Sequence, residues 1–203
     1  KISPVIPTQS QLENLIECAP YPSEDMFNAI VKVISEGKNE DIKKLTLHML
    51  EINKDKLLYY PAAKSFHHAV KGGLLYHTYS MMRSARALLK IYDFMDDDLV
   101  YAGVALHDLC KLREIMSDEN GISDSYTLEG RLLGHITMMV CDIQSEAEKL
   151  GIDPEVTLLL KHMVLSHHGE PEFGAAVRPM FIEAELLSEL DLMDSRVFEM
   201  REA

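Results

Sequence analysis

Apolar residues recur every three or four positions along almost the whole chain, which is the spacing of amphipathic helices. One such segment follows Ser23, which we expect to cap it, and stops at Gly37. Asn39 starts the next helix, whose predicted inward-facing residues are Ile42, Leu45, Met49 and Ile52. A shorter helix is predicted before these two, from Gln9 to Cys18.

Further helices are predicted at residues 74–92, from "MDDD" to near Lys111, at residues 128–150 and 154–166, and from Met180 onward. Only "REIMSDENGISDSYTLE" has strand character, and we expect a short hairpin that turns at Asn120–Gly121. The sequence therefore predicts an all-α bundle of about seven helices with one short β-hairpin. Residues 1–22 would be a linker or N-terminal segment, and residues 23–203 the helical domain.

Composition narrows the possible classes of function. The 203 residues suffice for one domain, and the net charge of −13 leaves no basic face for nucleic acid or membrane binding. No apolar run approaches the roughly 18 residues of a membrane helix. The three cysteines form no CxxC pair, which favours reduced thiols and a cytoplasmic location. Since the chain starts at Lys1 without a secretory signal, we expect it to be a piece of a longer protein.

Histidine and aspartate residues gather where predicted helices end. Any single one of the nine histidines is more often a surface or hydrogen-bonded residue than a metal ligand, and we interpret His48 and His162 in that way. A second group is His77, His107, Asp108, His135, His167, His168 and Asp191. Asp191 lies among leucines, where burial without a partner is costly. Imidazole and carboxylate groups without a thiolate suit Mn, Fe, Zn or Mg, so these residues predict a divalent metal site.

The order of these residues also carries a family resemblance. "LLYHT", "LHDLCK", "LLGHI", "SHHGEPEFG" and "ELDLMDSR" resemble, in this order, the H…HD…H…HH…D pattern of the HD-domain metal-dependent phosphohydrolases. "PAAKSFHHAVKGGLLYHT" and "EGRLLGHI" are similar to the YhaM type of bacterial 3′–5′ exoribonuclease. The likeness covers roughly residues 60–196 and implies an HD-domain helical bundle.

The resemblance implies roles for individual residues. A first ion would be held by His77, His107, Asp108 and Asp191, and a second by Asp108, His135, His167 and His168. Lys111 would contact phosphate and act with Asp108 in catalysis, although without the family it would pass for a solvated helix end. Arg131, four residues before His135, would reach a phosphate oxygen or be a surface charge, and His68 is a candidate substrate contact.

The implied activity is metal-dependent phosphodiester hydrolysis, with RNA or single-stranded DNA trimmed from the 3′ end to nucleoside 5′-monophosphates. A phosphohydrolase of small nucleotides and a regulatory HD module with little activity are the alternatives. Relatives of the YhaM type carry an N-terminal OB-fold domain, which we expect to help bind the strand, and the chain is compatible with homo-oligomer formation. One departure from the family is Cys110, which stands where a glycine is common and would crowd the turn that presents Lys111.

Overall fold

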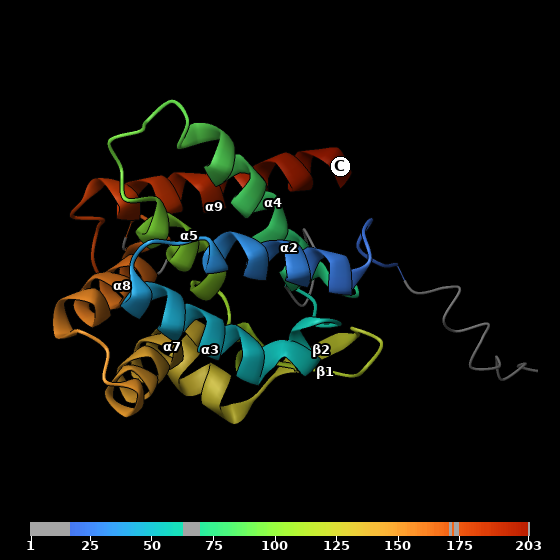
Figure 1. The fold of residues 1–203 in the computed structure, drawn as a ribbon. Helices are drawn as coiled ribbons and strands as arrows, with labels where there is room; N and C mark the ends of the chain where they lie inside the picture. Colours follow the sequence, from blue (N-terminus) through green and yellow to red (C-terminus); the bar gives the residue numbers. More distant parts are fainter. Residues whose placement is uncertain (1–16, 63–69, 171, 173–174, 203) are drawn as a thin grey trace, which may run out of the picture.

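The helices surround a short central one in the computed structural model, which describes residues 17–62, 70–170, 172 and 175–202 (Figure 1). They are α2 (Ser23–Ser35), α3 (Glu40–Leu57), α4 (Gly73–Leu88), α5 (Asp97–Leu106), α6 (Lys111–Glu114), α7 (Leu128–Leu150), α8 (Pro154–Ser166) and α9 (Ile182–Glu202). Helix α5 is the central one and packs against α2, α3, α4, α8 and α9. The predicted all-α bundle with one short hairpin is confirmed.

Helix α5 is buried on all sides because its sequence is almost wholly apolar. From Leu99 to Leu106 every residue except Tyr101 is buried. A helix with apolar side chains all round is stable only when other elements cover it completely. Gly103 allows the closest approach, since a Cβ atom there would lie 2.5 Å from Met163 Cε of α8 and 3.1 Å from Leu187 Cδ2 of α9. The residue that follows α5 is therefore delivered into the interior of the bundle.

The predicted helix signals hold at several ends. Asn39 caps α3, because its side chain accepts hydrogen bonds from the backbone N–H groups of Asp41 and Ile42 at 3.1 and 3.2 Å. Asp153 caps α8 in the same way, and Gly151 ends α7 in a left-handed conformation at φ 68°. These local signals succeed because each satisfies backbone groups that a helix end leaves unpaired.

Other expectations about the first two helices are wrong. Ser23 is the first residue of α2 rather than its cap, and Pro22 occupies the capping position without a side-chain hydrogen bond. Ile52 is 56% exposed, because the buried stripe of α3 passes through Met49 and Leu50 and leaves Ile52 at its solvent edge. Of the helix predicted to end at Cys18, residues 9–16 lie outside the described residues, and Cys18 itself pairs with Lys71 in an isolated parallel bridge.

The helix expected to continue to Lys111 ends earlier, at Leu106. Tight turns replace the regular helical bonds, since the N–H of Leu109 bonds the carbonyl of Leu106 and the N–H of Lys111 bonds the carbonyl of Asp108. The chain therefore changes direction at His107 and Asp108 before the short helix α6 begins.

A hairpin connects α6 to α7. Strand β1 (Ile115–Ser117) pairs antiparallel with β2 (Ser123–Tyr126), and Ile115 lies opposite Tyr126. The turn contains Gly121 at φ 77°. The Asp118 side chain organises the turn, because its Oδ1 accepts the N–H groups of Asn120 and Ile122, both at 2.9 Å. The predicted hairpin is thus confirmed, with residues 118–122 as its loop.

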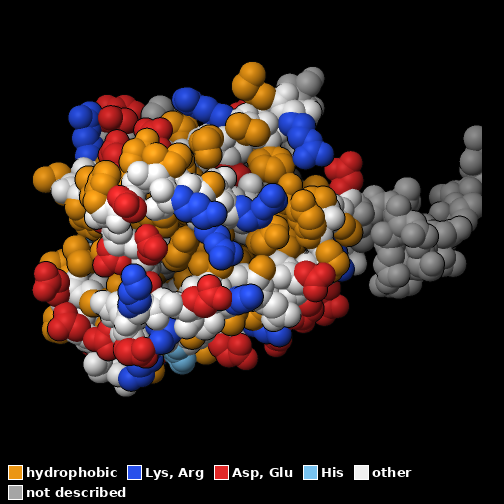
Figure 2. All heavy atoms as spheres, turned by 45° about the horizontal axis from the view of Figure 1, so that its top comes forward, with side chains coloured by type: hydrophobic (Ala, Val, Ile, Leu, Met, Phe, Trp, Pro, Cys, Tyr) orange, Lys and Arg blue, Asp and Glu red, His pale blue; other side chains and the backbone are white. Residues whose placement is uncertain are grey.

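Charged and apolar side chains are mixed on the surface. On the face that α4 and α9 present, Lys and Arg gather near the middle, with hydrophobic side chains and Asp or Glu around them (Figure 2). This view shows no continuous basic surface, in keeping with the net charge of −13. Among the described helices, none combines the length and the apolar character needed to cross a membrane.

The cap of α3 gives a test of the fold. Asn39→Ala removes the acceptor for two N–H groups, so we expect it to lower the free energy of unfolding by about 1 kcal/mol. Asn39→Ser keeps a side-chain oxygen and should retain most of the stability. Urea denaturation of both variants measures the difference, and an alanine variant as stable as the serine variant would contradict the assigned cap.

Candidate metal centre

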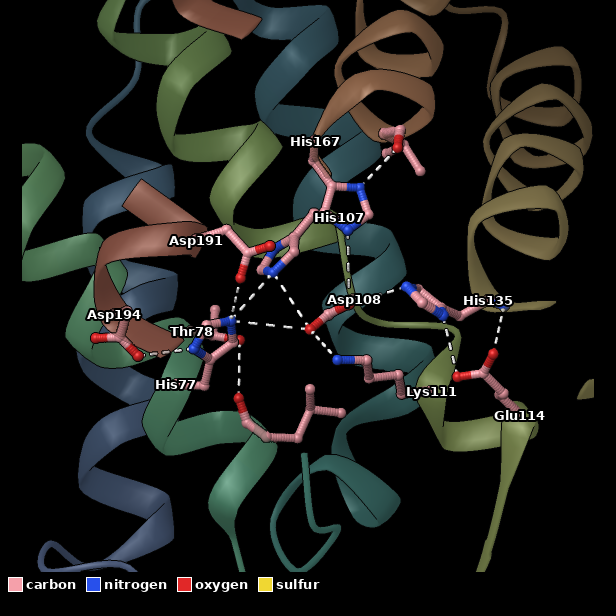
Figure 3. A network of polar contacts seen from close by, with 12 residues as sticks. His77, Thr78, His107, Asp108, Lys111, Glu114, His135, His167, Asp191 and Asp194 are labelled. Atoms are coloured by element: carbon pink, nitrogen blue, oxygen red, sulfur yellow. Dashed lines mark hydrogen bonds and ion pairs between the residues drawn. The ribbon is translucent and has the colours of Figure 1, made fainter. Parts of the chain in front are cut away.

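Three ligand-type side chains from distant parts of the sequence meet at the end of α5. His77 comes from α4, His107 follows α5 and Asp191 comes from α9. Their ligand atoms all lie within 4.8 Å of one another. His77 Nε2 is 3.3 Å from His107 Nε2 and 3.2 Å from Asp191 Oδ1 (Figure 3). This group thus directs two imidazole nitrogens and one carboxylate oxygen toward the same region.

A second group of ligand-type side chains lies beside the first. It consists of His135 on α7 and of His167 and His168 in the turn after α8. One nitrogen from each of the three rings lies within 4.8 Å of the others. The described residues thus contain two three-residue groups of metal-ligand chemistry.

Asp108 lies between the two groups and is only 3% exposed. Its Oδ2 is 3.4 Å from His107 Nε2 and 3.8 Å from His77 Nε2. Its Oδ1 is 3.2 Å from His135 Nε2 and 3.9 Å from His167 Nε2 (Figure 3). The two oxygens of one carboxylate therefore face one group each.

The residues present fit a bound cation. Of the five buried side-chain atoms that lack a hydrogen-bond partner among the residues that the structure describes, four lie here: Asp108 Oδ1, His135 Nε2, His167 Nε2 and His168 Nδ1. Buried polar atoms are normally paired, so four orphans in one place need an explanation. Histidine nitrogens bind metal at about 2.1 Å, which puts opposite ligands of one ion about 4 Å apart, close to the spacing found here. The nitrogen and oxygen donors suit Mn, Fe, Zn or Mg.

Two of the histidines are oriented by the helix ends that precede them. His107 Nδ1 lies 3.0 Å from the carbonyl of Val104, and His167 Nδ1 lies 2.7 Å from the carbonyl of Val164. The last carbonyls of a helix lack backbone partners and accept such hydrogen bonds. When Nδ1–H donates to a carbonyl, Nε2 keeps its lone pair free for a metal. The same contact, from Nδ1 to the carbonyl three residues earlier, thus orients the histidine that follows α5 and the one that follows α8.

Two carboxylates that the sequence analysis missed orient the other histidines. Asp194 Oδ2 lies 2.7 Å from His77 Nδ1, and Glu114 Oε2 lies 3.0 Å from His135 Nδ1 (Figure 3). Carboxylates behind ligating histidines fix the ring and its tautomer. A signal existed for Asp194, because it follows Asp191 by three residues and so lies on the same side of α9.

Glu114 was harder to find because its role depends on a break in α7. Gly134 has φ 71° and ψ 158°, which interrupts the helix. The backbone N–H of His135 is freed by this break and donates to Glu114 Oε1 at 3.1 Å. Close contact is possible because Gly130 lies against Glu114, where a Cβ atom would be 2.4 Å from its carbonyl oxygen. Glu114 therefore both caps the second part of α7 and orients the His135 ring.

The same break corrects the spacing argument for Arg131. A continuous helix would place Arg131 and His135 on one face, but the dihedral angles of Gly134 interrupt that register. Arg131 is exposed on the first part of α7. The structure thus brings His77, His107, Asp108, Lys111, His135, His167, His168 and Asp191 together.

Burial and nearby charges set the protonation of the first group. Burial disfavours the charged form of His77, but hydrogen bonds to Asp191 and Asp194 outweigh it and raise the pKa of His77 to about 9. Burial alone would raise the pKa of Asp108, but Lys111 and His107 hold it well below the ordinary value. Asp108 is therefore ionised, as a metal ligand must be.

The histidines of the second group differ from one another in the direction of their pKa shifts. Burial disfavours protonation of His135, but the nearby carboxylates of Asp108 and Glu114 raise its pKa to about 8. Burial lowers the pKa of both His167 and His168. These two rings are therefore neutral at pH 7, which is the form of imidazole that binds metal.

Lys111 reaches the centre in spite of the cysteine before it. Lys111 Nζ lies 2.6 Å from Asp108 Oδ2, and this contact raises the pKa of Lys111 although burial opposes it. The Cys110 side chain is turned toward α7, where its Sγ lies 3.3 Å from Asp142 Oδ2 and 3.6 Å from Met139 Sδ. The expectation that Cys110 crowds the turn that presents Lys111 is therefore wrong, because the thiol packs against α7 instead.

The remaining histidine predictions have different outcomes. His48 Nε2 lies 3.0 Å from Glu146 Oε2, and His162 Nε2 accepts the N–H of Met180 at 3.0 Å. Both are hydrogen-bonded residues, as expected of lone histidines. His68, the candidate substrate contact, lies outside the described residues.

Comparison with known proteins agrees with a helical bundle that brings these histidines and aspartates together. The HD domain family matches residues 74–196, more than half of the chain, and the protein belongs to this family. Similar curated proteins are the 3′–5′ exoribonucleases YhaM of Bacillus licheniformis, Bacillus pumilus and Bacillus subtilis, which are 42%, 41% and 41% identical over 187, 189 and 186 residues.

These alignments cover 92%, 93% and 92% of this chain, but only 59%, 59% and 58% of the three relatives. The chain thus spans less than two thirds of the length of the curated relatives that it matches. No solved structure matches the chain.

The position of Asp108 predicts a shared loss of metal. We expect Asp108→Ala to lower the metal content of both ligand groups to near zero, because its two oxygens face one group each. Elemental analysis of protein purified without chelator, with circular dichroism to check the fold, measures this. Asp55→Ala, an exposed carboxylate on α3, is the matched control. Wild-type metal content in the Asp108→Ala protein would refute the shared position.

The contact behind His77 predicts a smaller effect. We expect Asp194→Asn to weaken metal binding by about 10- to 100-fold, because the amide orients the imidazole less strongly than the carboxylate does. Calorimetric titration of the metal-free protein with Mn²⁺ measures the affinity. Unchanged affinity in Asp194→Asn, with Asp55→Asn as the reference, would show that the contact does not support metal binding.

Proposed function

We propose that this HD domain hydrolyses phosphodiester bonds at the 3′ ends of RNA or single-stranded DNA and releases nucleoside 5′-monophosphates. The observation that carries the proposal is the position of Asp108, whose two oxygens face one ligand group each, and the second group contains three imidazole nitrogens without a hydrogen-bond partner among the described residues. Three relatives named 3′–5′ exoribonuclease support the choice of reaction. A paired metal site is the usual device for displacing one phosphate oxygen by another.

The ligand sets follow from the two groups. His77, His107, Asp108 and Asp191 would hold one divalent ion, and Asp108, His135, His167 and His168 the other. Such ions supply Lewis acidity and lower the pKa of a water molecule toward 7, which makes it a nucleophile at neutral pH. Their four positive charges would exceed the two negative charges of Asp108 and Asp191, so the loaded site would attract phosphate within a chain of net charge −13.

Lys111 has the best position to assist the reaction. Its ammonium group is 2.6 Å from Asp108 Oδ2 and therefore lies beside the place where the phosphate would bind. There it would stabilise the negative charge that builds on the phosphoryl oxygens as the water oxygen bonds to phosphorus. The bond from phosphorus to the 3′ oxygen of the preceding nucleotide breaks, and the terminal nucleoside keeps the phosphate.

The rest of a longer protein would contribute to substrate binding. The chain spans 59% of two of the relatives, and an OB-fold domain in the remainder would supply the stacking surface that single strands require. None of the three cysteines, all of which are among the described residues, forms a disulfide, which fits the reducing cytoplasm where such an enzyme would work.

A phosphohydrolase of small nucleotides is the second candidate. The specific observation in its favour is the charge of −13, because a domain that binds long nucleic acid through its backbone normally carries a basic surface. The two candidates differ in whether the chain shortens RNA or acts only on free nucleotides.

A labelled strand tests the direction of hydrolysis. With Mn²⁺ and a 5′-labelled single-stranded RNA, we expect a ladder of products that shorten one nucleotide at a time, because the nucleophile attacks the last phosphodiester bond. The ladder should vanish when the 3′ end is blocked. Gel electrophoresis of both strands measures this, and internal cuts or hydrolysis of free nucleotides alone would overturn the exonuclease proposal.

A further inference from the structure

A groove of about 610 Å³ opens beside the candidate metal centre, between the turn that follows α8 and helix α9. At the metal centre its wall contains His167, His168 and Asp191. His167 is fully buried, and its Nε2 has no hydrogen-bond partner among the described residues, so an unpaired ligand atom lies at the wall of the groove. The groove is therefore the space next to the metal centre that a substrate would occupy.

Two features of the chain form this groove. Gly169 has φ 72° and turns the chain back against α9, where a Cβ atom would lie 2.8 Å from Ser188 Oγ. The opposite wall is one face of α9, with Ser188, Leu192, Ser195 and Arg196 at helical spacing. Because the lining residues of α9 extend from Glu185 to Glu199, on both sides of Asp191, the groove runs along the helix past the metal centre.

Arg196 is the unneutralised cation of this groove. The other arginine in the wall, Arg178, is paired with Glu170 through its Nη2. Arg196 forms no ion pair with any residue for which the structure gives a placement. The other charged side chains along α9 in the wall are the carboxylates Glu185, Glu189, Asp191 and Glu199. An anion in this groove would thus be repelled by most of the wall and attracted by one guanidinium group.

We infer that Arg196 binds a backbone phosphate of the substrate strand, next to the phosphate that is hydrolysed. Arg196 follows Asp191 by five residues, a rise of about 7.5 Å along the helix, and its long side chain reaches further along the groove. A guanidinium group matches phosphate with two parallel hydrogen bonds. The inference rests on the proposed function for its substrate class and adds a substrate-binding residue on α9 that is not one of the H…HD…H…HH…D ligand positions.

The acidic wall limits how many phosphates the groove accepts. With Arg178 already paired, the groove offers one cation for phosphate, so the contact should contribute about one charge to binding. For single strands each neutralised phosphate adds about 0.7 to the slope of log affinity against log salt concentration. Arg196 should therefore account for a small part of the salt dependence of binding and for a measurable part of the affinity for the strand.

The experiment compares Arg196→Gln, Arg196→Lys and the wild type, with Arg86→Gln, an exposed arginine on α4, as the control for loss of one charge. Turnover is measured with Mn²⁺ on a 5′-labelled oligoribonucleotide and on bis(p-nitrophenyl) phosphate, which has a single phosphate. Binding is measured by fluorescence anisotropy with a phosphorothioate strand, which resists hydrolysis, at several salt concentrations.

We expect Arg196→Gln to raise KM for the oligoribonucleotide about tenfold, with kcat changed less than twofold, and to leave hydrolysis of bis(p-nitrophenyl) phosphate unchanged. The salt slope should fall by about 0.7, and Arg196→Lys should recover part of the affinity, because a lysine keeps the charge without the paired hydrogen bonds. Arg86→Gln should behave as the wild type.

The outcomes separate the two proposals. The role of Arg196 is overturned, even if RNA is shortened, by either of two results. One is an equal KM for the oligoribonucleotide in Arg196→Gln and wild type, and the other is an equal loss of activity on the oligoribonucleotide and on bis(p-nitrophenyl) phosphate. If the wild-type protein binds the strand without cleaving it, and Arg196→Gln binds the strand more weakly, the role of Arg196 is supported and the exonuclease proposal is overturned. A wild-type protein that neither binds nor cleaves the strand overturns both.

Discussion

The burial of the apolar part of α5, residues 99–106, is the constraint on which the rest of the structure depends. Because this helix exposes almost no polar face, it has to lie where other helices cover it, and Gly103 lets α8 and α9 approach closely. The residues after α5 therefore emerge in the interior rather than at the surface. His107 and Asp108 are those residues, and the turn at their position holds them where α4, α7, α8 and α9 supply the other ligand-type side chains.

The interior position has an energetic consequence. Buried carboxylate and imidazole groups are unfavourable unless they are paired, and the structure pairs their outer sides with Asp194, Glu114 and two helix-end carbonyls. Their inner sides remain unpaired at four atoms among the described residues. A fold that fixes the outer sides of these rings and directs the unpaired nitrogens of His135, His167 and His168 toward Asp108 is preorganised for a cation, because binding then requires little rearrangement.

Much of the fold and the set of ligand-type residues could be predicted from the sequence, because helix periodicity and caps such as Asn39 and Gly151 are local signals. The prediction that these histidines form one site came from their order along the chain, which resembles the family pattern H…HD…H…HH…D. Glu114 and the loss of register at Arg131 could not be predicted, since both depend on the left-handed conformation of Gly134 inside an otherwise regular helical pattern. Ile52 was misplaced because periodicity defines a face but does not locate its solvent edge.

The charge distribution connects the acidic chain with the proposed phosphate substrate. A net charge of −13 works against binding of long nucleic acid at distance, and the groove wall contains more carboxylates than free cations. Among the described residues, attraction for the proposed substrate would come from the metal centre, Lys111 and the guanidinium of Arg196, a short stretch that would contact few phosphates. A strand held at so few phosphates gains little from its length, so the domain by itself would favour a chain end over an internal segment, and affinity for long RNA would have to come from outside these residues.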